Sequence, residues 1–169
     1  MPSVRLALSL FLLMVAPWTS RAVDAPKPVP PGLTAFLEGT WTGSGEFASG
    51  KKISAAASFA SELGGQWLSY RHEDRPPGRY QALGLWGYDR QSGDFVMSLH
   101  DSGGGLRRFS STGWTQGGIV FERGEPDRER FRFERLDDDR MKMTYERGDG
   151  AGWKMVDYVV FVRESESKK

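Results

Sequence analysis

Apolar and polar residues alternate along most of the chain after Gly39, with the two-residue period of a strand that buries one face. In "RERFRFER", Phe131 and Phe133 fall on one face, while arginine and glutamate occupy the other. The same alternation occurs in "RMKMTYER" and "DFVMSLH", whose apolar positions are Met141, Met143 and Tyr145, and Phe95, Met97 and Leu99. These segments are therefore predicted to be strands. The one helix that the pattern predicts is a short turn from Gly32 to Leu37.

Turn-forming residues interrupt this alternation about every eight to twelve residues, which is the spacing of an all-β sandwich or barrel. Nine such signals, from Ala48-Ser49-Gly50 to the glycines at 148–152, separate ten candidate strands. Short strands joined by tight turns in sequence order form a meander, and a long meander tends to close because closure removes the exposed edges. We therefore expect an all-β fold, a ten-stranded antiparallel meander β-barrel.

The first candidate strand lies in "LEGTWTGSGEF", where a tryptophan stands among glycines. Glycine weakens a strand unless the strand bends sharply or passes close to another backbone. Gly39, Gly43 and Gly45 are therefore expected to allow the bend where the chain enters the barrel. Trp41 is expected to point inward and to fill the closed end that the bend creates.

These residues carry a family resemblance. Gly39-Thr40-Trp41 after a short helical turn resembles the Gly-x-Trp signature of the calycin superfamily, the lipocalins and their relatives. The longer pattern through Gly43 and Gly45 is similar to the nitrobindin-like and fatty-acid-binding-protein-like barrels. "GLWGYDRQSGDFV" followed by "HDSGGG" resembles an exported bacterial family of that group whose function is not characterised. The resemblance covers Leu33 to Arg163, and it implies that Arg163 lies over Trp41; the alternative is a solvated terminal charge.

The two ends of the chain are predicted to lie outside the barrel. Residues 1–25 combine a positive start, an apolar run from Leu6 to Ala16 and small residues suited to cleavage, which is the composition of a secretory signal. The run is too short for a membrane anchor, which needs roughly 20 apolar residues. A proline-rich lead-in (26–32), the barrel domain (33–163) and a polar tail (164–169) follow. We expect an exported protein of a bacterial periplasm, with no stable membrane insertion after cleavage.

Net charge and cysteine content exclude some classes of partner and exclude disulfide bonds. Loss of Arg5 and Arg21 with the signal changes the formal charge from +1 to −1, which gives no electrostatic footprint for nucleic acid. The chain has no cysteine, so the fold is held without disulfides. The sequence does not indicate an oligomeric state.

The candidate chemistry is sparse. Nitrobindin-like haem proteins bind iron through a late histidine, and no histidine follows His100, so we expect no haem and no other cofactor. His72 is expected to be solvated, and His100 beside Asp101 is too small a set for a zinc site. Asp137-Asp138-Asp139 could hold calcium, but a solvated turn is the favoured reading. No metal site and no nucleophile motif are predicted.

Asp157 in the last strand leaves one alternative open. If Met155, Val159 and Phe161 face inward, Asp157 also faces inward, and a buried carboxylate needs a partner. If Tyr158 and the valines beside it face inward, Asp157 is exposed. Alternation does not decide between Asp157 and Tyr158.

The function that these features favour is non-catalytic binding of a small apolar ligand inside the barrel. The cavity wall would comprise Tyr70, Trp86, Met97, Phe133, Met143 and Tyr145. Two alternatives remain: an envelope structural or interaction protein with a filled barrel, and a cavity enzyme, an isomerase or hydrolase, that uses a carboxylate or His100. Fold alone does not choose among them.

Overall fold

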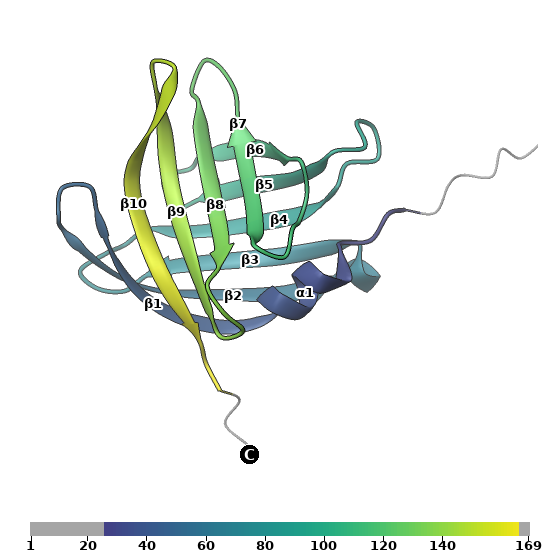
Figure 1. Ribbon diagram of the computed structural model, residues 1–169, viewed down its shortest axis with the longest axis horizontal. Coiled ribbons are helices and arrows are strands. Elements are labelled where there is room, and N and C mark those ends of the chain that lie inside the picture. The colour runs from purple at the N-terminus through teal and green to yellow at the C-terminus, as the bar shows by residue number, and fades with distance from the viewer. Residues whose placement is uncertain (1–25, 166–169) are drawn as a thin grey trace, which may run out of the picture.

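The alternating segments form ten antiparallel strands that close into a barrel (Figure 1). The computed structural model describes residues 26–165; the predicted signal segment 1–25 and the end of the polar tail lie outside them. The elements are α1 (Pro31–Leu37), β1 (Gly39–Phe47), β2 (Lys52–Glu62), η1 (Leu63–Gly65), β3 (Trp67–Asp74), β4 (Gln81–Tyr88), β5 (Phe95–Asp101), β6 (Leu106–Ser111), β7 (Gly118–Arg123), β8 (Glu129–Arg135), β9 (Arg140–Asp149) and β10 (Gly152–Arg163). Each strand pairs with the next, and β1 pairs with β10 to close the sheet. The predicted meander is confirmed.

Helix α1 covers one end of the barrel. It begins with Pro31, a residue suited to the first helical position because the N–H that proline lacks would be unpaired there. Its buried face consists of Leu33, Phe36 and Leu37. The Phe36 ring packs edge-on against Trp41, with ring centroids 5.9 Å apart, and stacks on Trp114 at 5.8 Å. These contacts close this end of the barrel with apolar side chains.

Trp41 is fully buried beneath this helix. Its indole Nε1–H donates a 2.8 Å hydrogen bond to the carbonyl oxygen of Leu37, at the end of α1. The guanidinium carbon of Arg163 lies 4.2 Å from the centre of the Trp41 ring, and the same group donates to the carbonyl of Glu38 at 2.7 Å. Trp41 and Arg163 thus connect the first strand, the last strand and the helix.

The glycines of β1 permit a close approach to β10. A Cβ atom at Gly43 would lie 2.7 Å from the side chains of Val159 and Phe161, and one at Gly45 would collide with the carbonyl group of Tyr158. Real Cβ atoms do not approach other heavy atoms so closely. Any larger residue would therefore separate the two strands that close the barrel.

The barrel interior changes character along its axis. Towards α1 it is filled by aromatic side chains around Trp86, whose ring centre lies 4.7 Å from Phe121 and 4.8 Å from Phe133. Towards the other end the inward positions become polar. Five strands begin or end there, at or near Asp74, Asp101, Arg107, Glu129 and Arg147. The α1 end is therefore a solid core, and any interior space lies towards the other end, which we call the mouth.

Two irregularities shape the mouth. Strands β6 and β7 share one register pair within residues 26–165, Ser110 with Glu122, so they diverge over most of their length. Strand β10 has a bulge between Met155 and Asp157, where Met155 stands opposite Glu146 and Asp157 opposite Tyr145. Directly paired residues of antiparallel strands point to the same face. Asp157 therefore points inward, in regular alternation with Val159 and Phe161, and the bulge turns Met155 outward.

Candidate functional site

A cavity of about 370 Å³ occupies the mouth half of the barrel. Its apolar wall comes from seven strands and consists of Phe47, Ile53, Ala82, Leu99, Phe131, Met143, Val156 and Val159. Its polar wall consists of Tyr70, His72, Asp74, Tyr80, Asp101, Arg107, Tyr145, Arg147 and Asp157. The volume lies within the range of roughly 300–1,000 Å³ that is usual for small-molecule sites. The mixture of walls suits a ligand that is largely apolar and carries a polar group.

Strand β3 contributes a chain of three hydrogen-bonded side chains to this wall. The Tyr70 hydroxyl lies 3.1 Å from His72 Nδ1, and His72 Nε2 lies 2.9 Å from the Asp74 carboxylate. If His72 Nε2–H donates a hydrogen bond to Asp74, then Nδ1 accepts a hydrogen bond from the Tyr70 hydroxyl. Burial raises the pKa of Tyr70 well above its ordinary value, so this hydroxyl stays protonated. His72 is 6% exposed, so the expectation that it is solvated is wrong.

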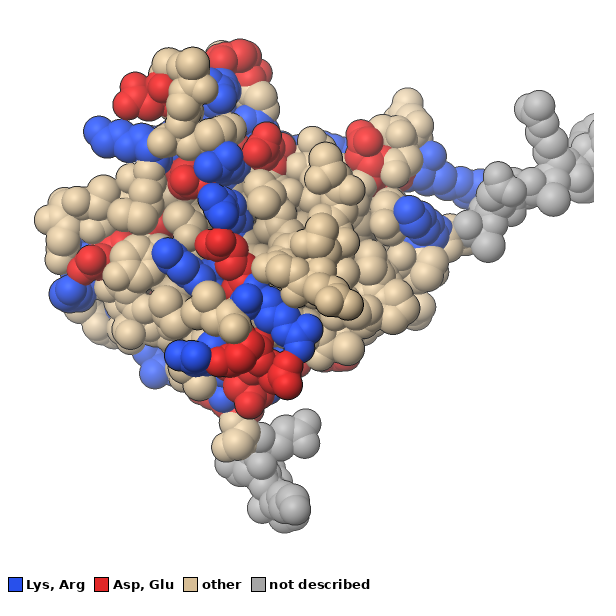
Figure 2. All heavy atoms as spheres, viewed as in Figure 1, with Lys and Arg blue, Asp and Glu red and all other residues tan. Residues whose placement is uncertain are grey.

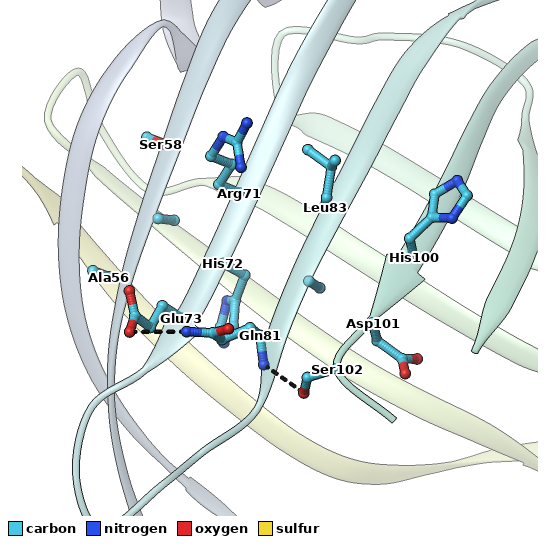
Figure 3. A pocket seen from close by; sticks show the side chains of 12 residues that line it. Ala56, Ser58, Arg71, His72, Glu73, Gln81, Leu83, His100, Asp101 and Ser102 are labelled. Carbon is cyan, nitrogen blue, oxygen red and sulfur yellow. Dashed lines mark hydrogen bonds between the residues drawn. The ribbon is translucent and has the colours of Figure 1, made fainter. Parts of the chain in front are cut away.

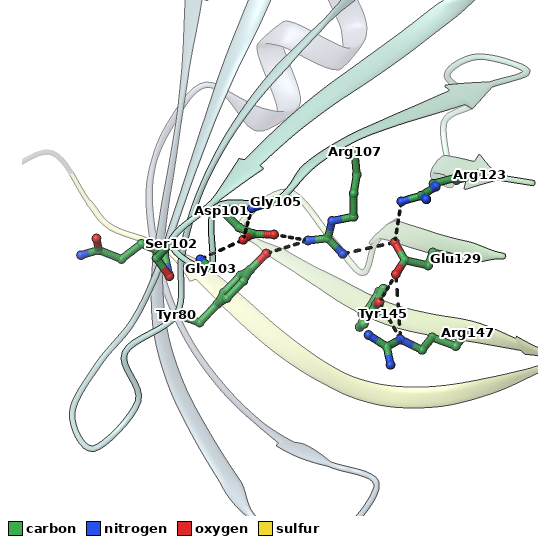
Figure 4. A network of polar contacts seen from close by, with 11 residues as sticks. Tyr80, Asp101, Ser102, Gly103, Gly105, Arg107, Arg123, Glu129, Tyr145 and Arg147 are labelled. Atoms are coloured by element: carbon green, nitrogen blue, oxygen red, sulfur yellow. Dashed lines mark hydrogen bonds and ion pairs between the residues drawn. The ribbon is translucent and has the colours of Figure 1, made fainter. Parts of the chain in front are cut away.

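A second polar group surrounds Glu129 at the mouth (Figure 4). We call it the mouth cluster; it comprises Tyr80, Asp101, Arg107, Glu129, Tyr145 and Arg147. Arg107 donates to Asp101 at 2.9 Å and to Glu129 at 3.2 Å, while the Tyr145 hydroxyl donates to the other oxygen of Glu129 at 2.9 Å. Since Arg107 lies on β6 and Glu129 on β8, the pair spans the place where β6 and β7 diverge.

Asp157 lines the cavity from β10. Burial raises the pKa of its carboxyl group to about 6, and the nearby His72 opposes that rise. Among residues 26–165 no side chain forms a hydrogen bond or an ion pair with this carboxyl. The pairing with β9 answers which residue faces inward: Asp157 stands opposite Tyr145, and both line the cavity.

The six residues predicted to form the cavity wall divide into two sets. Tyr70, Met143 and Tyr145 line the cavity. Trp86, Met97 and Phe133 are buried in the solid core nearer to α1, beyond the cavity wall. All six point inward, and ligand binding at any of them stays a prediction. In "YRHED", His72 and Asp74 lie at alternate positions after Tyr70 and therefore point to the same, inward face. This spacing could have placed them in the cavity, but the interpretation of the sequence considered apolar residues only.

A second hollow, an open groove of about 460 Å³, lies on the outer surface of β2 to β5 (Figure 3). Glu73 accepts a hydrogen bond from the Gln81 amide at 3.1 Å there, and the Gln81 backbone N–H donates to Ser102. His100 is exposed on this outer face, away from the interior. Chemistry inside the barrel would therefore have to use groups of the cavity wall, such as His72 or Asp157, and not His100.

The charged surface is made of neighbouring opposite charges. On the face shown in Figure 2, lysine and arginine side chains lie interspersed with aspartate and glutamate. In the turn before β9, Asp137 accepts from Arg140 at 2.7 Å, and Asp138 pairs with Arg135. No group of three or more potential metal ligands occurs within the part of the chain that the structure describes. None of the helices in that same part of the chain is both long enough and apolar enough to cross a membrane.

Comparison with known proteins supports the fold. The sequence matches no protein-family model and no curated protein. Among solved structures, Rv2717c from M. tuberculosis is similar to this chain, with a TM-score of 0.57 and 18% sequence identity. The match covers 81% of this chain and 99% of that one. A likeness at such low identity shows a shared barrel fold and carries no function.

Proposed function

We propose that this protein binds a small, largely apolar molecule in the mouth half of its barrel, without transforming it. The observation that carries the proposal is the cavity itself, which remains beside a core that is otherwise filled with aromatic side chains. A barrel of this size commonly holds one small ligand. The apolar wall supplies the affinity, because each square ångström of apolar surface removed from water contributes about 25 cal/mol.

The polar wall supports binding more than catalysis. The ionisable groups of the mouth cluster are engaged with one another, as Arg107 with Asp101 and Glu129 shows. His72 is likewise held by Tyr70 and Asp74. Groups held in this way are fixed in position and can orient the polar group of a ligand.

The test is a titration with a neutral apolar fluorophore, N-phenyl-1-naphthylamine, in the parent and in two matched variants. Met143→Trp adds bulk to the cavity wall and should abolish saturable binding, at a modest loss of stability because empty space receives the ring. Met155→Trp places the same side chain on the outer face of β10 and should leave binding unchanged.

The filled-barrel alternative gives the opposite result. In that case the parent shows no saturable binding, and Met143→Trp overpacks the interior and lowers the free energy of unfolding by about 1–3 kcal/mol. Such an outcome would remove the binding function and favour a structural or interaction role.

We further propose that the barrel acts after export, in a bacterial periplasm. The supporting feature is the signal-like composition of residues 1–25, which lie outside the described part of the chain. Fractionation of the native host, followed by N-terminal sequencing, should recover a periplasmic chain that begins near Val23 or Pro26. Recovery of an uncleaved chain from the cytoplasm would contradict it.

A further inference from the structure

The charged groups around the cavity form two sets, which differ in their balance of positive and negative charge. The mouth cluster contains two guanidinium groups, Arg107 and Arg147, and two carboxylates, Asp101 and Glu129. A third guanidinium, Arg123, lies 3.9 Å from Glu129 and is itself paired with Asp127 at 3.2 Å. The formal charges of the mouth cluster therefore cancel within the cluster. A ligand charge that approached this side would compete with contacts that are already made.

The second set lies on β3 and β10. It consists of the carboxyl groups of Asp74 and Asp157 and the imidazole of His72, and these two strands contribute no lysine or arginine to the cavity wall. His72 Nε2 lies 2.9 Å from Asp74, and its Nδ1 lies 3.1 Å from the Tyr70 hydroxyl. Because both ring nitrogens have partners, His72 has no N–H left to donate to Asp157.

Asp157 is therefore a carboxyl group that faces the cavity without a partner among the described residues. Burial disfavours its charged form, as the direction of its pKa shift shows, and the neighbouring Asp74 disfavours it further. An ionised carboxylate in such a place is costly unless a cation or a hydrogen-bond donor pairs with it. The apolar surfaces of Ile53, Leu99 and Val159 line the same cavity.

We propose that the ligand of this cavity is a small apolar amine, whose ammonium group pairs with Asp157 while its hydrocarbon part lies against the apolar wall. The inference rests on the proposed binding function and names its ligand class. An ammonium group satisfies the carboxylate by charge-assisted hydrogen bonds, which are about twice as strong as neutral ones. A carboxylate ligand would instead be repelled by Asp157 and Asp74.

Three naphthalene compounds of similar shape test the proposal: 1-naphthylmethylamine, 1-naphthalenemethanol and 1-naphthoic acid. Affinities are measured by calorimetry at pH 7.5 with the parent protein. The amine should bind about tenfold more tightly than the alcohol, which is the effect of one charge-assisted hydrogen bond, and the acid should bind most weakly.

Two variants locate this preference. Asp157→Asn should lose the preference for the amine and keep its affinity for the alcohol, which also reports that the variant is folded. Asp94→Asn removes an exposed carboxylate in the turn before β5, at the opposite end of that strand from Asp101 and outside the cavity wall, and should behave as the parent does.

The outcomes separate this inference from the binding function. Equal affinity for amine and alcohol, tighter binding of the acid, or an amine preference that persists in Asp157→Asn would overturn the inference and leave interior binding standing. If none of the three compounds binds the parent and the neutral fluorophore does not bind either, the binding function fails and the inference fails with it.

Discussion

Trp41 combines three contacts in one side chain: it is fully buried, it hydrogen-bonds to Leu37, and it lies beneath the guanidinium of Arg163. Trp41→Ala should therefore lower the free energy of unfolding by about 3–5 kcal/mol, as for other large aromatic side chains removed from a core. Denaturant unfolding of the mature protein measures this change.

The matched control is Trp153→Ala. Trp153 lies on the outer face of β10, under the guanidinium groups of Arg128 and Arg130 at 4.8 and 4.5 Å. Its removal should cost about 1 kcal/mol or less, the scale of an exposed cation–π contact. A loss below about 1 kcal/mol for Trp41→Ala as well would mean that the indole does not close the barrel end.

Asp157 should give the protein a pH dependence of stability. Its pKa is about 6 in the folded protein against an ordinary value of 3.8, so the folded state binds the proton more tightly than the unfolded state. The stabilisation by protonation is present at low pH and is lost as the pH rises from about 4 through about 6. Asp157→Asn should remove this loss and make the protein about 1–3 kcal/mol more stable than the parent at pH 7.5.

Urea unfolding of both proteins between pH 4 and 7.5 tests this prediction. His72 and Asp74 face Asp157 from β3, and Tyr145 stands opposite it on β9. These groups are common to both proteins, so the difference between the two pH profiles reports Asp157. Parallel profiles would show that its carboxyl ionises as freely in the folded protein as in the unfolded chain.

At the scale of elements, alternation was sufficient to predict the strands. The inward residues of β8 and β9, including Phe133, Met141 and Met143, are those that the period of two selects. The same rule fails in β10, because one extra residue in the bulge reverses the parity of everything before Asp157. The order of apolar and polar residues in this segment does not indicate a bulge, so the bulge is seen only in the pairing with β9.

The gap between β6 and β7 makes Glu129 an important link. This buried carboxylate accepts hydrogen bonds from Arg107 on β6 and from Tyr145 on β9. It therefore links the two sides of the gap, where β6 and β7 share one register pair. Glu129→Gln removes its charge and leaves Arg107 incompletely paired, which should destabilise the protein by about 1–3 kcal/mol. Hydrogen exchange should also quicken at the amides of β6 and β7.

Glu46→Gln provides the control for this effect. Glu46 on β1 pairs with Lys52 at 2.5 Å, but the Lys52 side chain is 82% exposed. Exposed pairs contribute little, so the variant should remain within about 0.5 kcal/mol of the parent and should not alter exchange in β6 or β7. Equal effects of the two substitutions would contradict a special role for the mouth cluster.

At the scale of the whole molecule, the candidate site was predictable in part. Alternation shows equally well that Trp86 and Tyr145 point inward, but it does not give the position of either residue along the barrel axis. That position depends on the register between strands, which places Trp86 in the solid core and Tyr145 beside the cavity. Polar inward residues such as His72 were missed because a search for apolar positions discards them.

The barrel as a whole is also expected to exclude haem. Ligation of the iron by histidine requires a free imidazole nitrogen, but both nitrogens of His72 have partners in Tyr70 and Asp74, and His100 is exposed on the outer face. The purified protein should therefore be colourless, and titration with hemin should give no saturable Soret shift. His72→Ala and His100→Ala, titrated in parallel, identify the ligand if a shift does occur. A saturable shift in the parent that either substitution abolishes would overturn this prediction, and it would mean that the histidine contacts described above yield to iron.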